Sequence, residues 1–119
     1  MSETTRNQMH DRLHDSLTII AAAFARVDIR IGDPSAADLH TDVHHWQQAV
    51  WNSAGDLGGL NTARALGAAA RRWVYAATAY TAYRSLAAEF NHSLFLGHIR
   101  PCESALEDLV QGCRQVVRS

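Results

Sequence analysis

Apolar residues recur along the first quarter of the chain at the spacing of an amphipathic helix. Leu13, Leu17, Ile20, Phe24, Val27 and Ile31 follow one another at intervals of four, three, four, three and four residues. This spacing gives one apolar stripe, so it predicts a first helix over residues 8–31. Gly32-Asp33-Pro34-Ser35 then ends the helix, and we expect the polar residues 1–7 to fray.

The next two segments also have helical character. Leu39, Val43, Trp46 and Val50 repeat the pattern and predict a helix over residues 36–53, capped by Ser35 or Asp38. Three glycines within residues 55–59 end it. The alanine-rich residues 61–90 predict a third helix with an unusually small face, which would let another backbone approach closely. Asn91 is expected to break this helix and cap the next.

The last segment repeats the apolar spacing through Cys102, Leu106, Leu109, Cys113 and Val116, which predicts a fourth helix over residues 93–117. Pro101 either starts a separate helix there or kinks a continuous one, so we expect a break or kink at this residue. Four amphipathic helices with short connections predict an all-α fold, namely a four-helix up-and-down antiparallel bundle. The 119 residues fit a single helical-bundle domain over 1–119.

Composition narrows the function classes. The formal net charge is −1, so there is no basic excess for nucleic-acid phosphates, and nucleic-acid binding is not expected. Lysine is absent and all eleven basic residues are arginine, which with the abundant alanine is typical of actinobacterial genomes. No apolar run is long enough for a membrane span, and the N-terminus lacks the apolar core of a signal peptide. Two reduced cysteines are in keeping with a cytoplasmic protein.

Histidine is the unusual residue type, with seven in the chain. In an up-and-down bundle, His40, His44, His92 and His98 would lie at one end, where they could hold zinc, another transition ion or a haem iron. Alternatively, these histidines do not bind a metal and are solvated or singly hydrogen-bonded. We favour this second interpretation, so we expect no cofactor. The same topology would separate His10 and His14 from His40 and His44 by about 25 Å or more.

Aromatic residues indicate a contact surface. Trp51 and Tyr75 fall off the apolar stripes and are predicted to be exposed, and exposed rings often mark a partner surface. Together with the small face of the third helix they favour a homodimer. The candidate interface residues are Trp51, Trp73, Tyr75, Tyr80 and Tyr83.

No catalytic motif is found in the sequence. We therefore predict an interaction module that self-associates, with a further protein partner as an option. The first alternative is a bundle that binds a metal or small ligand at the histidine-rich end. The second alternative is a small enzyme in which a histidine acts as general base in a bundle pocket.

Overall fold

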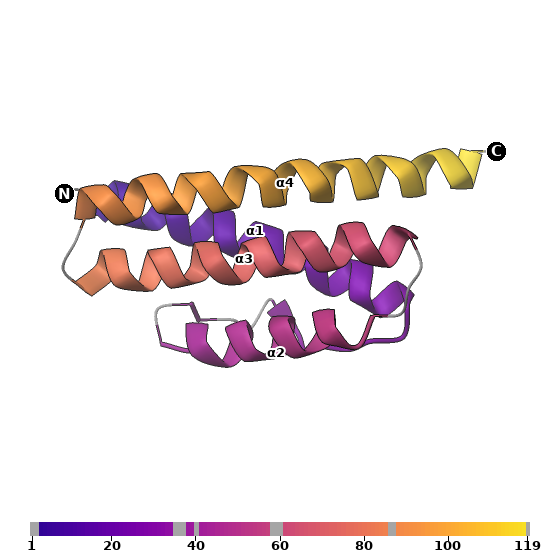
Figure 1. Cartoon of the computed structure of the whole chain (residues 1–119), viewed down its shortest axis with the longest axis horizontal. Helices are drawn as coiled ribbons and strands as arrows, with labels where there is room; N and C mark the ends of the chain where they lie inside the picture. Colours follow the sequence, from indigo (N-terminus) through magenta and orange to yellow (C-terminus); the bar gives the residue numbers. More distant parts are fainter. Residues whose placement is uncertain (1–2, 35–37, 40, 58–60, 86–87, 119) are drawn as a thin grey trace.

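Over the residues that the structure describes, the computed structural model forms four α-helices (Figure 1), which confirms the all-α, four-helix bundle prediction. The helices are α1 (Glu3–Arg26), α2 (Val43–Gly55), α3 (Asn61–Ser85) and α4 (Ala88–Arg118). The structure describes residues 3–34, 38, 39, 41–57, 61–85 and 88–118, and the side chains of 4–34, 38, 39, 41–57, 64–82 and 92–111.

Helix α3 is the central element, because it packs against each of the other three helices. Its small face is buried through five alanines (Ala69, Ala70, Ala76, Ala77 and Ala79). These side chains let neighbouring helices approach closely, while the rings of Trp73 and Tyr80 fill the wider gaps at 0 % exposure. The small face of α3, which the sequence analysis predicted to favour a homodimer, is therefore covered by the other helices of the same chain.

The helix directions differ from the predicted up-and-down order. Trp73 Nε1 on α3 donates a hydrogen bond of 2.8 Å to the main-chain oxygen of Leu13, and the ring of Tyr80 lies 6.4 Å from that of His10, so α3 runs antiparallel to α1. Gln47 Nε2 on α2 donates to Thr78 Oγ1 at 2.8 Å, while Trp51 lies beside Tyr75. Helix α2 is thus also antiparallel to α3, and α1 and α2 run in the same direction.

The connection between α1 and α2 makes this order possible. Helix α1 ends and α2 begins at opposite ends of the bundle (Figure 1), so the chain returns along the bundle between Arg26 and Val43. The prediction assigned most of these residues to helices and left only a short turn, which would have forced an antiparallel pair. An extended residue covers about twice the length of a helical one, so this segment can return to the end where α1 began.

The early end of α1 has a local cause. Asp28 has a left-handed backbone with φ of 62°, and Ile29 N–H donates to Phe24 O at 2.9 Å while Asp28 N–H donates to Ala25 O at 3.2 Å. These two bonds are those of a Schellman motif, which usually has glycine at the left-handed position. The helix therefore ends at Arg26, before Gly32, and Val27 becomes exposed.

Other boundaries also shift. Helix α1 begins at Glu3, earlier than the predicted residue 8. Helix α2 begins at Val43 instead of residue 36, although Leu39 before it is still buried in the core. Asn91 lies inside α4 and does not cap it. Of the two alternatives for Pro101, the structure has the continuous helix, with Pro101 inside α4.

Candidate functional site

Three aromatic side chains from three helices lie in contact on the outer surface of the bundle. The rings of Trp51 on α2 and Tyr75 on α3 are 6.1 Å apart between centroids, at an interplanar angle of 65°. The ring of Tyr75 lies 5.4 Å from that of His98 on α4. We call Trp51, Tyr75 and His98 the ring row. Trp51 and Tyr75 are each 45 % exposed, as their position off the apolar stripes predicts.

The ring row continues into a charged contact. Arg72 NH1 lies 3.2 Å from His98 Nδ1, and a guanidinium can only donate, so this nitrogen of His98 must be unprotonated. Burial lowers the pKa of His98, and the positive charge of Arg72 lowers it further. His98 is therefore a neutral member of the ring row, held between Tyr75 and Arg72.

The outward stripe of α3 places further arginines beside these rings. Arg64, Ala68, Arg71 and Tyr75 are all exposed and follow at intervals of four, three and four residues, so they share one face of the helix. Leu94, one turn before His98 on α4, is also exposed. The outer surface of α2, α3 and α4 thus combines rings with guanidinium groups.

The remaining candidate interface residues lie elsewhere. Trp73 and Tyr80 are fully buried in the core, so they cannot contact a partner while the bundle is folded. The side chain of Tyr83 lies outside the described residues. Of the four candidates whose side chains are described, the structure brings only Trp51 and Tyr75 together at the surface, and His98, predicted as a metal ligand, lies beside them. The sequence did not indicate His98 as a neighbour of these rings, because its position depends on how α3 packs against α4. Residue spacing within one helix does not reveal this packing.

The proposed metal-binding histidines lie against different neighbours. His92 lines a cavity between α1 and α4, whereas His98 packs on α3. His44 is exposed on α2, and His40 lies outside the described residues. Within the described part of the chain, no three histidine, cysteine, aspartate or glutamate side chains are placed to hold a metal ion. Burial raises the pKa of the Cys102 thiol to about 12, which keeps this neighbouring residue protonated at neutral pH.

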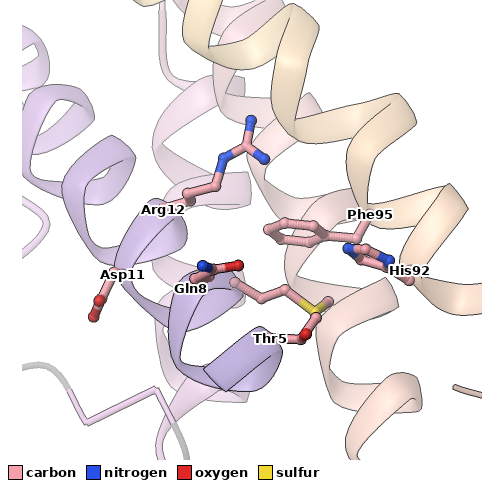
Figure 2. Close-up of a pocket in the computed structure, with 7 residues that line it drawn as sticks. Thr5, Gln8, Asp11, Arg12, His92 and Phe95 are labelled. Carbon is pink, nitrogen blue, oxygen red and sulfur yellow. The ribbon is translucent and has the colours of Figure 1, made fainter. Parts of the chain in front are cut away.

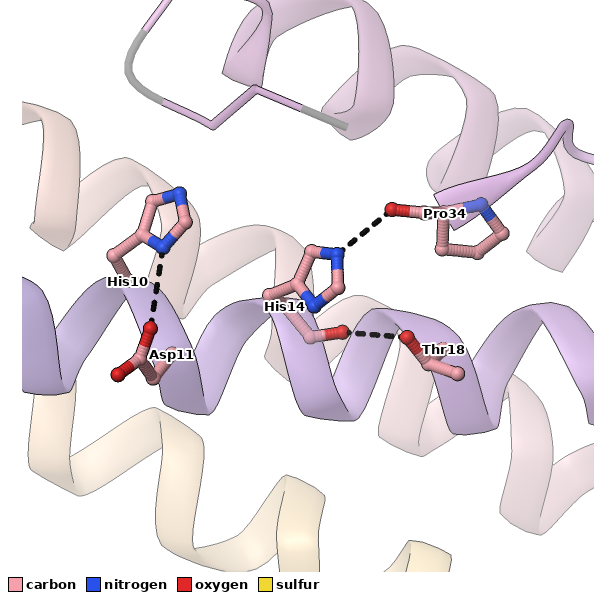
Figure 3. Close-up of polar contacts among 5 residues, drawn as sticks. All are labelled: His10, Asp11, His14, Thr18 and Pro34. Carbon is pink, nitrogen blue, oxygen red and sulfur yellow. Dashed lines mark hydrogen bonds and ion pairs between the residues drawn. The ribbon is translucent and has the colours of Figure 1, made fainter. Parts of the chain in front are cut away.

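The His10 and His14 rings stack on each other along α1, with centroids 6.4 Å apart. His14 Nε2 lies 2.8 Å from the main-chain oxygen of Pro34, and His10 Nδ1 lies 3.6 Å from a carboxylate oxygen of Asp11 (Figure 3). This contact of His14 with Pro34 holds the connection between α1 and α2 against α1. The predicted placement of this pair and His44 at opposite ends of the bundle is wrong, because α1 and α2 both begin at the end where α3 ends.

A cavity of about 290 Å³ lies between the first turns of α1 and α4. Its lining residues are Thr5, Gln8, Met9, Asp11, Arg12, His92 and Phe95 (Figure 2). Arg12 at its edge is already engaged: its Nε donates to Glu103 Oε2 at 3.1 Å and its NH2 donates to Glu103 Oε1. These hydrogen bonds raise the pKa of Arg12. The Arg12 guanidinium therefore pairs α1 with α4 and is not available to a ligand in this cavity.

Comparison with family models, curated proteins and solved structures gives no match for this chain. Among the described residues, no helix combines the length and apolar character needed to cross a membrane.

Proposed function

We propose that this chain is a non-catalytic interaction module that binds a protein partner at the ring row. The single observation that carries the proposal is the contact of Trp51, Tyr75 and His98 from three different helices, with almost half of each of the two larger rings exposed. Large aromatic side chains gain free energy when a partner removes them from water, and tryptophan and tyrosine dominate the energetics of measured interfaces.

Two features support this position over the others on the bundle. The rings are held by neighbours on rigid helices, so little side-chain entropy is lost when a partner binds. Gln47 further ties α2 to α3 beside the ring row through its hydrogen bonds to Val74 O and Thr78 Oγ1. The surface is therefore preorganised in the way that tight recognition requires.

The sequence favours a second copy of the chain as the partner, and the ring row is the surface through which such a dimer would form. Native mass spectrometry over a range of concentrations would detect it. A dimer that disappears when Trp51 and Tyr75 are both replaced by alanine would support self-association at this surface.

The module itself is tested by selecting binders from a random peptide library displayed on phage. The wild-type chain should enrich a family of peptides, and a variant with Trp51→Ala and Tyr75→Ala should not bind them. Circular dichroism should show the same helical content in both proteins, because the two side chains are exposed. Failure to enrich any peptide, together with a monomer at all concentrations, would contradict the proposal, as would binding that survives loss of both rings.

A further inference from the structure

We infer that the ring row receives an acidic segment of another protein, with carboxylates of that segment paired to Arg71 and Arg72. The inference rests on the proposed function and names the chemistry of the partner. It follows from the charges around the ring row, which differ from those of the chain as a whole.

Helix α3 carries four arginines and no acidic residue, although the whole chain has a net charge of −1. Within the described residues, Arg64, Arg71 and Arg72 have no ion pair with a carboxylate, whereas Arg12 on α1 is paired with Glu103. The only polar contact of Arg72 there is with the neutral ring of His98. These guanidinium groups keep most of their donors free for a carboxylate.

The arginines and rings form one continuous surface. Arg72 touches His98, which touches Tyr75, and Arg71 lies one helical turn before Tyr75 on the exposed face of α3. A guanidinium binds a carboxylate through two parallel hydrogen bonds, and it does so more strongly where adjacent apolar groups exclude water. A segment with acidic and apolar side chains would therefore satisfy both parts of the surface.

Charge also argues against two other occupants. A two-fold dimer centred on this surface would bring Arg71 and Arg72 of both copies together, and like charges across an interface are unfavourable. A nucleic acid is disfavoured because acidic residues outnumber basic ones, twelve to eleven, so the chain has no net positive charge to attract phosphates. A short acidic segment avoids both costs.

The test is the charge of the peptides that the phage library yields. Peptides enriched on the wild-type chain should carry more aspartate and glutamate than the library, alongside apolar residues. In fluorescence anisotropy, the double substitution Arg71→Gln and Arg72→Gln should lower the affinity for a selected peptide about tenfold. It should also reduce the salt dependence of that affinity. The matched control, Arg6→Gln with Arg26→Gln on α1, removes the same charge away from the ring row and should leave the affinity within about twofold.

The outcomes separate the inference from the proposed function. Neutral or basic peptides that need the rings but not Arg71 and Arg72 would overturn the acidic partner and leave the module standing. A dimer lost in the ring variant, or a labelled oligothymidine that binds more tightly than any peptide, would overturn it as well. Binding that depends on neither rings nor arginines would overturn both.

Discussion

Arg72 on α3 and His98 on α4 meet through a single hydrogen bond in which the guanidinium donates to Nδ1 of the imidazole over 3.2 Å. The bond requires a neutral histidine, and protonation of His98 would set two positive charges against each other. This contact ties the chemistry of the ring row to pH and links two helices at the same point.

Stability should therefore depend on pH through His98. Its pKa is lowered in the folded chain, so as pH falls below about 6.5 the unfolded chain takes up a proton that the folded chain does not. The stabilising contribution is full above that pH and is lost as pH falls through the lowered pKa. Urea unfolding at a series of pH values should show that the stability advantage of wild type over His98→Gln shrinks as pH falls. A constant difference would contradict the contact with Arg72.

Trp73 on α3 and Trp51 on α2 should differ sharply in their effect on stability. Trp73→Phe removes the buried hydrogen bond to Leu13 O and leaves a cavity, so it should lower the free energy of unfolding by about 2–3 kcal/mol. Trp51→Phe changes an exposed ring and should stay within about 0.5 kcal/mol of wild type. Urea unfolding followed by circular dichroism measures both, and equal effects would be inconsistent with the burial described.

Asp28 offers a stabilising substitution. Its left-handed backbone is unfavourable for a residue with a Cβ atom, so Asp28→Gly should raise the free energy of unfolding by about 0.5–1 kcal/mol. Ala22→Gly on the exposed side of α1 serves as the control, and it should lower the free energy of unfolding by about 1 kcal/mol. If both glycines destabilise, the Schellman motif does not form in solution.

The Arg12–Glu103 pair should couple α1 to α4 only weakly. The two side chains are 35 % and 36 % exposed, so water screens the charges. A double-mutant cycle with Arg12→Met and Glu103→Gln should give a coupling of about 0.5–1 kcal/mol that falls as salt is added. A coupling of several kcal/mol, or one insensitive to salt, would mean that the pair is more deeply buried than the structure shows.

The apolar spacing was sufficient to predict the helices and much of the core. Leu13, Leu17, Ile20 and Phe24 are all buried on one side of α1. The same periodicity did not reveal where α1 ends, because the break comes from the left-handed backbone of Asp28, a residue type that signals it weakly.

The direction of α2 was predicted wrongly for the same reason, because the sequence pattern did not show where α1 ends. Once the connection was taken to be short, an antiparallel second helix followed, and the histidines of α1 and α2 were assigned to opposite ends. For the surface, the stripes correctly left Trp51 and Tyr75 exposed. The contacts of Arg72 and Tyr75 with His98 depend on the register of α3 against α4, which is a tertiary property that no local pattern encodes.

The most direct test of the docking surface uses the indole N–H signals of the nitrogen-15-labelled chain. A selected peptide should shift the signal of Trp51, which lies in the ring row, and leave that of Trp73 unchanged, because its Nε1–H is buried and bonded to Leu13 O. The tryptophan signals are assigned by single substitutions to phenylalanine. A peptide that binds without moving the Trp51 signal would place the contact surface elsewhere and contradict the account.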